Sequence, residues 1–360
     1  MTEAGSLTSA PQLLAEKAIA RAGGWIPFDR FMALALYAPG LGYYANDSRK
    51  FGTLPSSGSD FATAPEMTPL FGASVAVQVA EALRATETGE VWEFGAGSGA
   101  LALQLLDALG ESVARYTIVD LSSSLRQRQQ QVLEKHGARV RWVSELPDRF
   151  SGIVVGNEVL DAMPVKLLVR KGGVWHERGV GSELAWIDRT TGLRPPVDIP
   201  GDHDYLTEIH PQAEAFIRTL ADRLERGAAF FIDYGFGEDE YYHPQRHMGT
   251  LMCHRGHLAD TDPLTDIGRK DITAHVNFTG LALAAQEAGM PTLGYTSQAR
   301  FLMNCGLVAR LAGAPLKERI AGQRLLAEHE MGELFKVIGF HKGAFWDACG
   351  FSQGDRTGRL

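Results

Sequence analysis

The chain has 360 residues, of which 45% are hydrophobic, and its formal net charge is −8. This length accommodates one large α/β domain with insertions or two domains, and the apolar fraction is typical of a globular core. The acidic balance, without a dense block of lysine and arginine, argues against a nucleic-acid partner.

Cysteine usage and hydropathy bear on the compartment. The three cysteines are few and scattered, which is typical of reduced thiols in a cytosolic protein. The sequence contains no run of 18 apolar residues, so we expect no membrane span. The first residues lack the apolar core of a secretion signal. We therefore expect a cytoplasmic, bacterial protein rather than a mitochondrial one.

The first 85 residues are predicted to form an N-terminal helical region. Residues 11–46 suggest two helices followed by a turn rich in glycine and tyrosine. A further helix should have Thr68 as its N-cap and Pro69 as its first residue, a position that favours proline. Residues 86–345 are predicted to form a doubly wound, Rossmann-like domain, and residues 346–360 a loose C-terminal tail.

A glycine-rich turn opens the predicted domain. Residues 91–94 form a buried strand, leucines at helical spacing follow, and Gly95, Gly97 and Gly99 lie between them. Missing Cβ atoms let a ligand approach the main chain, although a purely structural turn also explains the glycines. The spacing is G-x-G-x-G, and Glu93 precedes it. A carboxylate there is a poor neighbour for pyrophosphate but suits S-adenosylmethionine, which carries a sulfonium and an ammonium.

The second predicted strand, residues 116–120, ends in Asp120. An acid in this place of a doubly wound fold contacts a ribose hydroxyl. Both NAD and S-adenosylmethionine carry that ribose, so Asp120 indicates a nucleoside without choosing between them. The alternative is that Asp120 caps the following helix. A third strand is predicted at residues 139–143.

Polar side chains follow the fourth and fifth predicted strands. Residues 152–156 lead into Asn157, Glu158 and Asp161, and a fifth strand over residues 227–235 contains Asp233. Ligands of an open parallel sheet lie at the carboxyl ends of its strands. The carboxylates could therefore bind a guanidinium or ammonium, or take its proton. The alternative is that Asn157 and Asp161 cap a helix.

Two insertions interrupt the late strands. The first, at about residues 165–205, alternates like a small antiparallel meander, and the second, at about 236–278, is polar. Residues 243–257 of the second hold four histidines and one cysteine, which are zinc ligands in other proteins. Their spacing matches no common zinc motif, so we expect no metal site.

Nine stretches in order resemble the MidA-like family of S-adenosylmethionine-dependent methyltransferases, which includes a mitochondrial methyltransferase of complex I assembly. They cover about residues 25 to 345 and read YAPGLGYY, DFATAPEMTPLFG, WEFGAGSGALA, GNEVLDAMPV, FIDYGF, YYHPQRHMGTL, DITAHVNF, TSQARFLMNCG and MGELFKV. Two positions depart from the family pattern: Asp120 stands where a Glu-Pro pair is common, and Ser98 replaces an arginine.

The resemblance implies a class I methyltransferase fold, S-adenosylmethionine as cofactor and a protein substrate. The mitochondrial relative is associated with symmetric dimethylation of an arginine in a complex I subunit. Glu158 and Asp161 are then the carboxylates beside the acceptor guanidinium, with Asp233 second in rank. Glu66, in the APEM stretch, would face the acceptor, hold the methionine ammonium of the cofactor, or cap the helix beside it.

Other functions stay open at this point. One is a non-catalytic assembly factor that binds S-adenosylmethionine, and another is a methyltransferase for a different protein or a small molecule. A nicotinamide oxidoreductase is disfavoured by the glycine spacing and by Glu93. Whether the protein forms a homodimer is also open.

Overall fold

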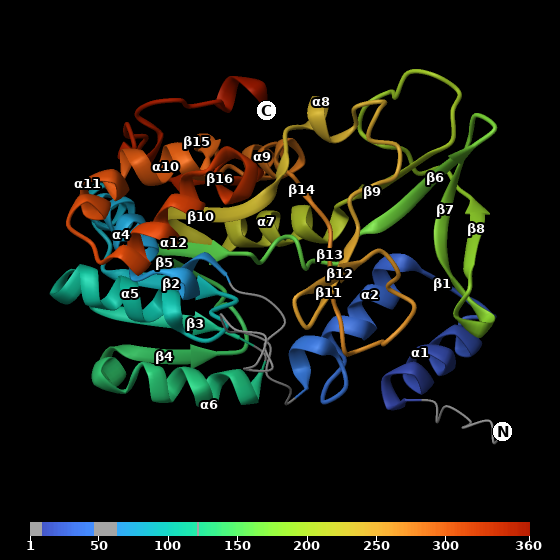
Figure 1. Ribbon diagram of the computed structural model, residues 1–360, viewed down its shortest axis with the longest axis horizontal. Helices are drawn as coiled ribbons and strands as arrows, with labels where there is room; N and C mark the ends of the chain where they lie inside the picture. Colours follow the sequence, from blue (N-terminus) through green and yellow to red (C-terminus); the bar gives the residue numbers. More distant parts are fainter. Residues whose placement is uncertain (1–8, 47–62, 121) are drawn as a thin grey trace. The chain divides into compact units, whose positions relative to one another are not determined.

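The computed structural model describes residues 9–46, 63–120 and 122–360. These residues form two compact units, each built from several chain segments (Figure 1). The sheet unit contains the described residues of 49–161, with Ala213–Tyr241 and His275–Leu360. The meander unit contains the described residues of 1–48, with Ala162–Gln212 and Tyr242–Ala274.

The sheet unit is built on one mostly parallel sheet with the strand order β15-β16-β10-β5-β2-β3-β4. Strands β2, β3, β4, β5 and β10 are parallel, β16 is antiparallel to both of its neighbours, and the short β14 pairs with β10. The strands are β2 (Glu90–Phe94), β3 (Arg115–Val119), β4 (Val140–Val143), β5 (Phe150–Asn157), β10 (Leu224–Phe236), β14 (Val276–Asn277), β15 (Thr292–Ser297) and β16 (Phe335–Lys342).

The strand order reverses between β2 and β5. From β2 the chain continues outward to β3 and β4, and it then returns to the other side of β2 to form β5 and β10. The carboxyl ends of strands at such a reversal form the crevice in which doubly wound folds bind ligands. The predicted doubly wound fold is thus confirmed, and each of the five predicted strands overlaps an observed one.

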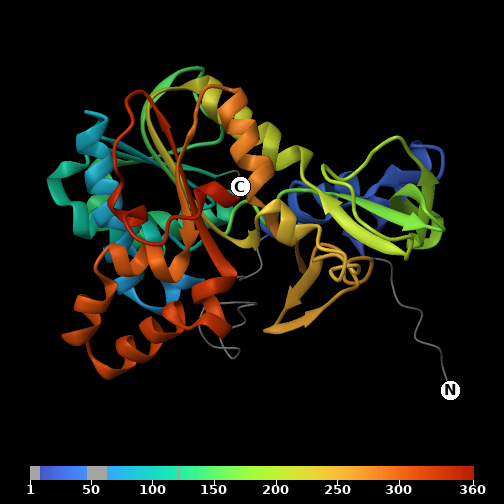
Figure 2. The same ribbon diagram turned by 90° about the horizontal axis from the view of Figure 1, so that it is seen from above.

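Helices flank the sheet of this unit. Thr68 accepts a hydrogen bond from the backbone N–H of Leu70, so α4 begins at Pro69 as the sequence predicts. Figure 2 shows the orange helices α10, α11 and α12 as one group, and α11 and α12 both contact α4. The helices are α3 (Ala64–Met67), α4 (Pro69–Ala85), α5 (Ala100–Leu109), α6 (Ser123–Val132), α7 (Pro211–Arg223), α8 (Glu238–Tyr241), α9 (Phe278–Glu287), α10 (Gln298–Asn304), α11 (Leu307–Ala312) and α12 (Leu316–Leu326).

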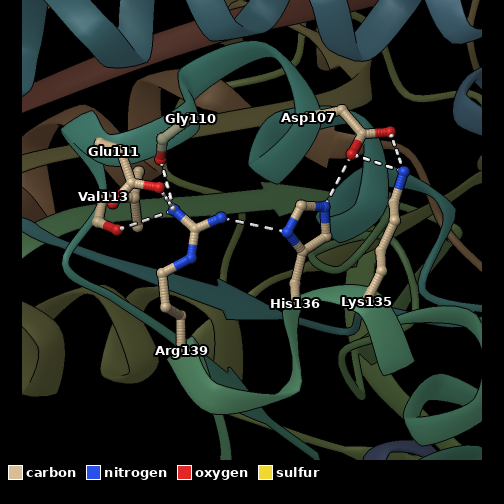
Figure 3. Close-up of polar contacts among 7 residues, drawn as sticks. All are labelled: Asp107, Gly110, Glu111, Val113, Lys135, His136 and Arg139. Carbon is tan, nitrogen blue, oxygen red and sulfur yellow. Dashed lines mark hydrogen bonds and ion pairs between the residues drawn. The ribbon is translucent and has the colours of Figure 1, made fainter.

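A polar network ties the segment after α6 to the end of α5 (Figure 3). The Arg139 guanidinium donates to the carbonyl oxygens of Gly110 at 2.5 Å and Val113 at 3.4 Å, and to Nδ1 of His136 at 3.1 Å. Nε2 of His136 then lies 2.7 Å from an Asp107 oxygen. A cationic side chain at the carbonyl end of a helix satisfies its last acceptors. The network therefore holds the segment after α6 against the end of α5.

The meander unit combines the N-terminal helices with both predicted insertions. Its five-stranded sheet is antiparallel throughout, with the order β1-β7-β6-β9 and β8 beside β7. Buried Glu208 accepts hydrogen bonds from the backbone N–H groups of Thr250 and Leu251, which joins the two insertions. The elements are α1 (Ala10–Arg21), β1 (Trp25–Pro27), α2 (Phe28–Tyr37), β6 (Lys166–Lys171), β7 (Val174–Gly181), β8 (Trp186–Thr190), β9 (Tyr205–Ile209), β11 (Met252–Arg255), β12 (Leu258–Asp260) and β13 (Asp271–Thr273).

This division differs from the predicted domains in three places. Both insertions were predicted within the domain of residues 86–345, yet most of their residues belong to the meander unit with the N-terminal helices. Helix α4 lies within the predicted N-terminal region 1–85, yet it packs in the core of the sheet unit. The predicted loose tail, residues 346–360, also packs on that unit. Phe351 is buried there, with its ring 5.5 Å from that of Phe301. The tail is short and mostly polar and has no periodic pattern of hydrophobic residues. The sequence analysis therefore missed that Phe351 anchors it to the sheet unit.

Removing this anchor should destabilise the protein. A Cβ atom at Gly294 or Gly339 would clash with the Phe351 ring, which shows how closely the two strands approach it. We expect Phe351→Ala to lower the free energy of unfolding by about 3–5 kcal/mol. Phe345→Ala, at a side chain that is 61% exposed, is the matched control. Equal denaturant midpoints for the two variants would show that the tail contributes nothing to stability.

Candidate active site

The predicted site residues of the sheet unit gather at the carboxyl ends of its parallel strands. The pairing of β5 with β2 ends at Gly156 and Phe94, and its pairing with β10 ends at Asn157 and Ile232. The next residues along each chain therefore lie side by side. Site residues found at this edge are Glu93, Gly95, Gly97, Gly99, Asp120, Asn157, Glu158, Asp161 and Asp233.

The glycine turn after β2 has the backbone that the sequence predicts. Gly95, Gly97 and Gly99 have φ angles of 62°, 51° and 87°, in the left-handed region that favours glycine. A Cβ atom at Gly95 would lie 2.8 Å from a methyl group of Val159, which follows β5. The turn thus needs glycine for its backbone and for packing against the β5 side of the crevice. Helix α5 begins immediately after it, at Ala100.

Glu93 is 2% exposed and lies at the base of this turn. The Tyr116 hydroxyl donates to Glu93 Oε2 at 2.8 Å. Burial raises the pKa of Glu93 to about 8, Tyr116 lowers it, and the charge of Asp120 raises it. A cation that binds beside this carboxyl group would favour its ionised form.

Asp120 follows β3 directly. One of its oxygens accepts from the Ser122 backbone N–H at 2.9 Å, and the other accepts from the Gln129 side chain at 2.9 Å. The cap of α6 is Ser122, whose hydroxyl accepts from the backbone N–H of Leu125. The alternative in which Asp120 itself caps the helix is therefore wrong, and its carboxylate is oriented at the strand end.

Asn157 and Glu158 form the bend after β5. Asn157 Nδ2 donates to Glu158 Oε1 at 3.0 Å, while its buried Oδ1 has no hydrogen-bond partner among the described residues. Glu158 has a φ of 54°, a strained conformation for a residue with a side chain. Burial and then the charge of Asp161 raise the pKa of Glu158 to about 8. Strain and a perturbed pKa together are typical of functional positions.

Asp161 is 5% exposed and accepts a 2.5 Å hydrogen bond from the Tyr234 hydroxyl at Oδ2. Tyr234 stands directly after Asp233 on β10, and its ring contacts those of His275 and Phe335 edge-on. The aromatic contacts fix the tyrosine, which in turn fixes Asp161. The predicted pair of Glu158 and Asp161 is therefore close enough to interact electrostatically.

Asp233 was predicted as a catalytic candidate, but its contacts favour a positioning role. It is 1% exposed, and its Oδ2 accepts from the backbone N–H groups of Val159, Leu160 and Asp161 at 2.8–3.3 Å. Burial raises its pKa, as do the charges of Asp161 and Glu158. Asp233 holds the bend that carries Glu158 and Asp161.

Glu66 joins the same carboxyl group cluster from α3. Its charge contributes to the raised pKa of Glu158, and the backbone N–H of Ala64 hydrogen-bonds the Glu158 carboxylate. Its placement is compatible with either predicted role, at the acceptor or at the methionine ammonium. Residues 60–62, which begin the DFATAPEM stretch, lie outside the described residues.

Three polar residues of the site were not identified from the sequence: Tyr116, Gln129 and Tyr234. Tyr116 could have been found, since alternation along β3 places it on the same face as Asp120. Gln129 lies one helical turn after buried Leu125, but it stands in a run of polar residues that resembles a solvent-exposed face. No sequence pattern identifies Tyr234 as a site residue, apart from its position directly after Asp233.

This donor and acceptor set fits a cationic nucleoside ligand. The crevice offers a buried carboxyl group at Glu93, an oriented carboxylate at Asp120 and an unpartnered acceptor at Asn157 Oδ1. These groups accept hydrogen bonds or favour positive charge, which matches an ammonium, a sulfonium and ribose hydroxyls.

Comparison with known proteins agrees with this chemistry. Residues 73–296 match a family described as putative S-adenosyl-L-methionine-dependent methyltransferases. The chain belongs to this family. It is a methyltransferase of the class I fold with S-adenosylmethionine as cofactor, and the predicted resemblance to MidA-like proteins is confirmed.

Solved structures and curated relatives extend the match over nearly the whole chain. A protein from Burkholderia thailandensis, solved bound to S-adenosyl-homocysteine, is 48% identical, with a TM-score of 0.94 and 97% coverage of both chains. The mitochondrial protein arginine methyltransferase NDUFAF7 homolog of Caenorhabditis elegans is 26% identical over 86% of this chain and 80% of its own length. NDUFAF7 of Danio rerio is 27% identical over 83% and 76%.

The described residues offer neither a metal site nor a membrane-spanning helix. Within residues 9–46, 63–120 and 122–360, no group of three or more histidine, cysteine, aspartate or glutamate side chains is arranged to hold a metal ion. Cys253 of the histidine-rich segment is buried in β11. None of the helices formed by the described residues has the length and apolar character needed to cross a membrane.

The raised pKa of Glu93 predicts how stability depends on pH. Its protonated form is favoured in the folded protein, so this contribution is complete below the unfolded value of about 4.5 and is lost as pH rises through about 8. Between pH 5 and 8 the free energy of unfolding should therefore fall less steeply in Glu93→Gln than in the native sequence. The difference is at most about 1.4 kcal/mol per pH unit. Denaturant titrations of the ligand-free proteins measure it, and equal slopes would contradict the raised pKa.

Proposed function

We propose that this protein methylates arginine side chains of a protein substrate, with a subunit of respiratory complex I as the first candidate. The observation that carries the proposal is the pairing of Glu158 with Asp161 at the end of β5, supported by Tyr234 and Asp233. The names of the curated relatives, protein arginine methyltransferases, favour the same acceptor.

The chemistry of a guanidinium suits this pair of acids. A guanidinium is planar, always charged, and offers several N–H donors to carboxylates. Burial and the neighbouring carboxyl groups raise the pKa of Glu158 to about 8, so its protonated form is favoured below that pH. An arriving cation offsets that repulsion and favours the ionised form. Cation binding and carboxylate ionisation are thus coupled at this position.

The cofactor and the acceptor would meet across the strand reversal. S-adenosylmethionine, when bound, supplies a methyl group on a sulfonium to an attacking nitrogen. Glu93, the glycine turn, Asp120 and Asn157 would hold the cofactor on the β2 and β3 side. Glu158 and Asp161 would orient the guanidinium by accepting its N–H hydrogen bonds. They would also localise its positive charge on the nitrogens that they contact, which leaves the remaining nitrogen more nucleophilic.

The amide variants Glu158→Gln and Asp161→Asn separate catalysis from cofactor binding. Each keeps the shape of its side chain and removes a charge-assisted contact worth about 1.5–3 kcal/mol. We expect a loss of roughly ten- to hundredfold in methyl transfer from at least one variant, with unchanged affinity for S-adenosylhomocysteine. Glu134→Gln, at an exposed carboxylate after α6, is the control. Full activity in both site variants would remove these carboxylates from the mechanism.

The pH dependence of kcat/KM for the acceptor provides a second test. Since the guanidinium stays charged, the free enzyme must ionise Glu158 to bind it, and kcat/KM should rise from pH 7 and level off above about pH 8. The rise should disappear in Glu158→Gln. A profile that is flat in the native sequence, or unchanged in the variant, contradicts this role.

The acceptor itself is identified by transfer of a labelled methyl group into lysate of the host, followed by mass spectrometry of the labelled band. Label on arginine supports the proposal, and label on lysine or on a small molecule overturns it. Binding of S-adenosylmethionine without any transfer would instead leave a non-catalytic assembly factor.

A further inference from the structure

Gln129 joins three parts of the cofactor side of the crevice through one buried amide. It lies on α6 and is fully buried. Its Nε2 donates to the carbonyl oxygen of Gly97 at 3.0 Å and to Asp120 Oδ2 at 2.9 Å. Its Oε1 accepts from Trp142 Nε1 on β4 at 2.9 Å. Both amide hydrogens therefore have acceptors, and the orientation of the amide is fixed.

Packing independently places α6 against the glycine turn. A Cβ atom at Gly99 would lie 3.5 Å from both Cα and Cγ of Gln129, which is an ordinary van der Waals distance. One turn earlier on the same helix, the Arg126 guanidinium lies 5.8 Å from the centre of the Trp142 ring. The network of Figure 3 holds the segment after α6 against α5. Gln129 is thus presented by a helix that contacts β4 through Arg126 and is followed by a segment held against α5.

This contact helps to orient the Asp120 carboxylate. Its other oxygen accepts from the Ser122 N–H, so the two bonds constrain the carboxylate at both oxygens. Without Gln129, one oxygen would lose a donor, and the side chain would gain rotational freedom that a ligand must then remove. The same change would release the Gly97 carbonyl.

We propose that Gln129 is a positioning residue for S-adenosylmethionine, which orients Asp120 toward the ribose hydroxyls and holds the glycine turn in its binding conformation. The inference concerns the cofactor alone, so it stands or falls independently of the acceptor. The protein should therefore bind a cofactor that carries ribose more tightly than one that carries 2′-deoxyribose.

The test compares S-adenosylhomocysteine with its 2′-deoxy analogue by calorimetry. The native sequence should bind the ribose form more tightly by about tenfold or more, as expected for a hydrogen bond to a carboxylate. In Gln129→Leu this ratio should fall toward one, while the affinity for the ribose form falls by at least about tenfold. Gln130→Leu, at the exposed neighbouring position on α6, is the matched control and should keep both values.

Each other outcome overturns the proposal. A purely structural role would weaken both ligands equally and leave the ratio unchanged, and a ratio near one in the native sequence would remove the contact between Asp120 and the ribose. If Gln129→Leu does not fold, Gln129→Glu keeps the shape. Its protonated carboxyl group has one O–H donor where the amide has two. At pH 5 this donor can still bond Asp120, so the ratio should stay above one, and it should fall to one by pH 8 because the ionised carboxylate repels Asp120. Discrimination that is independent of pH in that variant contradicts the role.

Discussion

Several buried carboxyl groups lie together at the carboxyl ends of the parallel strands, and the chemistry of the site depends on whether each of them is ionised. Burial raises the pKa values of Glu93, Glu158 and Asp233, because an ionised carboxylate loses its hydration there. Backbone amides, tyrosine hydroxyls and side-chain amides satisfy part of this demand. The sulfonium and ammonium of S-adenosylmethionine would supply positive charge on the cofactor side of the strand reversal, and the guanidinium of the proposed acceptor would supply it on the other side.

The two sides of the crevice are supported differently. On the cofactor side, Asp120 and the glycine turn are held by one side chain of α6. On the side of the proposed acceptor, three consecutive backbone N–H groups donate hydrogen bonds to Asp233, and the Tyr234 hydroxyl donates one to Asp161. The left-handed backbone of Glu158 is maintained by this bend, which stores strain at the point where the proposed chemistry takes place.

Local sequence patterns predict the parts of this structure that depend on local physics. Apolar runs locate the parallel strands, and the glycines with Glu93 locate the turn, since both signals lie within a few residues. The role of Asp233 depends on the register of β10 against β5, which only long-range pairing determines. Gln129 and Tyr234 were missed for the same reason, whereas the alternation along β3 could have identified Tyr116. The two insertions were predicted as separate segments, because no local sequence pattern indicates that Glu208 accepts hydrogen bonds from the backbone of the second insertion.

The segmented construction of the meander unit has a consequence for synthesis on the ribosome. Helix α2 buries Phe28, Phe31 and Leu36, and β1 pairs with β7, so the first segment of the chain needs partners that are made much later. The whole first half of the sheet unit is translated in between. At about 5–20 residues per second, the chain between α2 and β7 takes roughly 7–27 seconds to make. Nascent chains expose these apolar side chains for that time, so we expect them to need a chaperone at the exit tunnel.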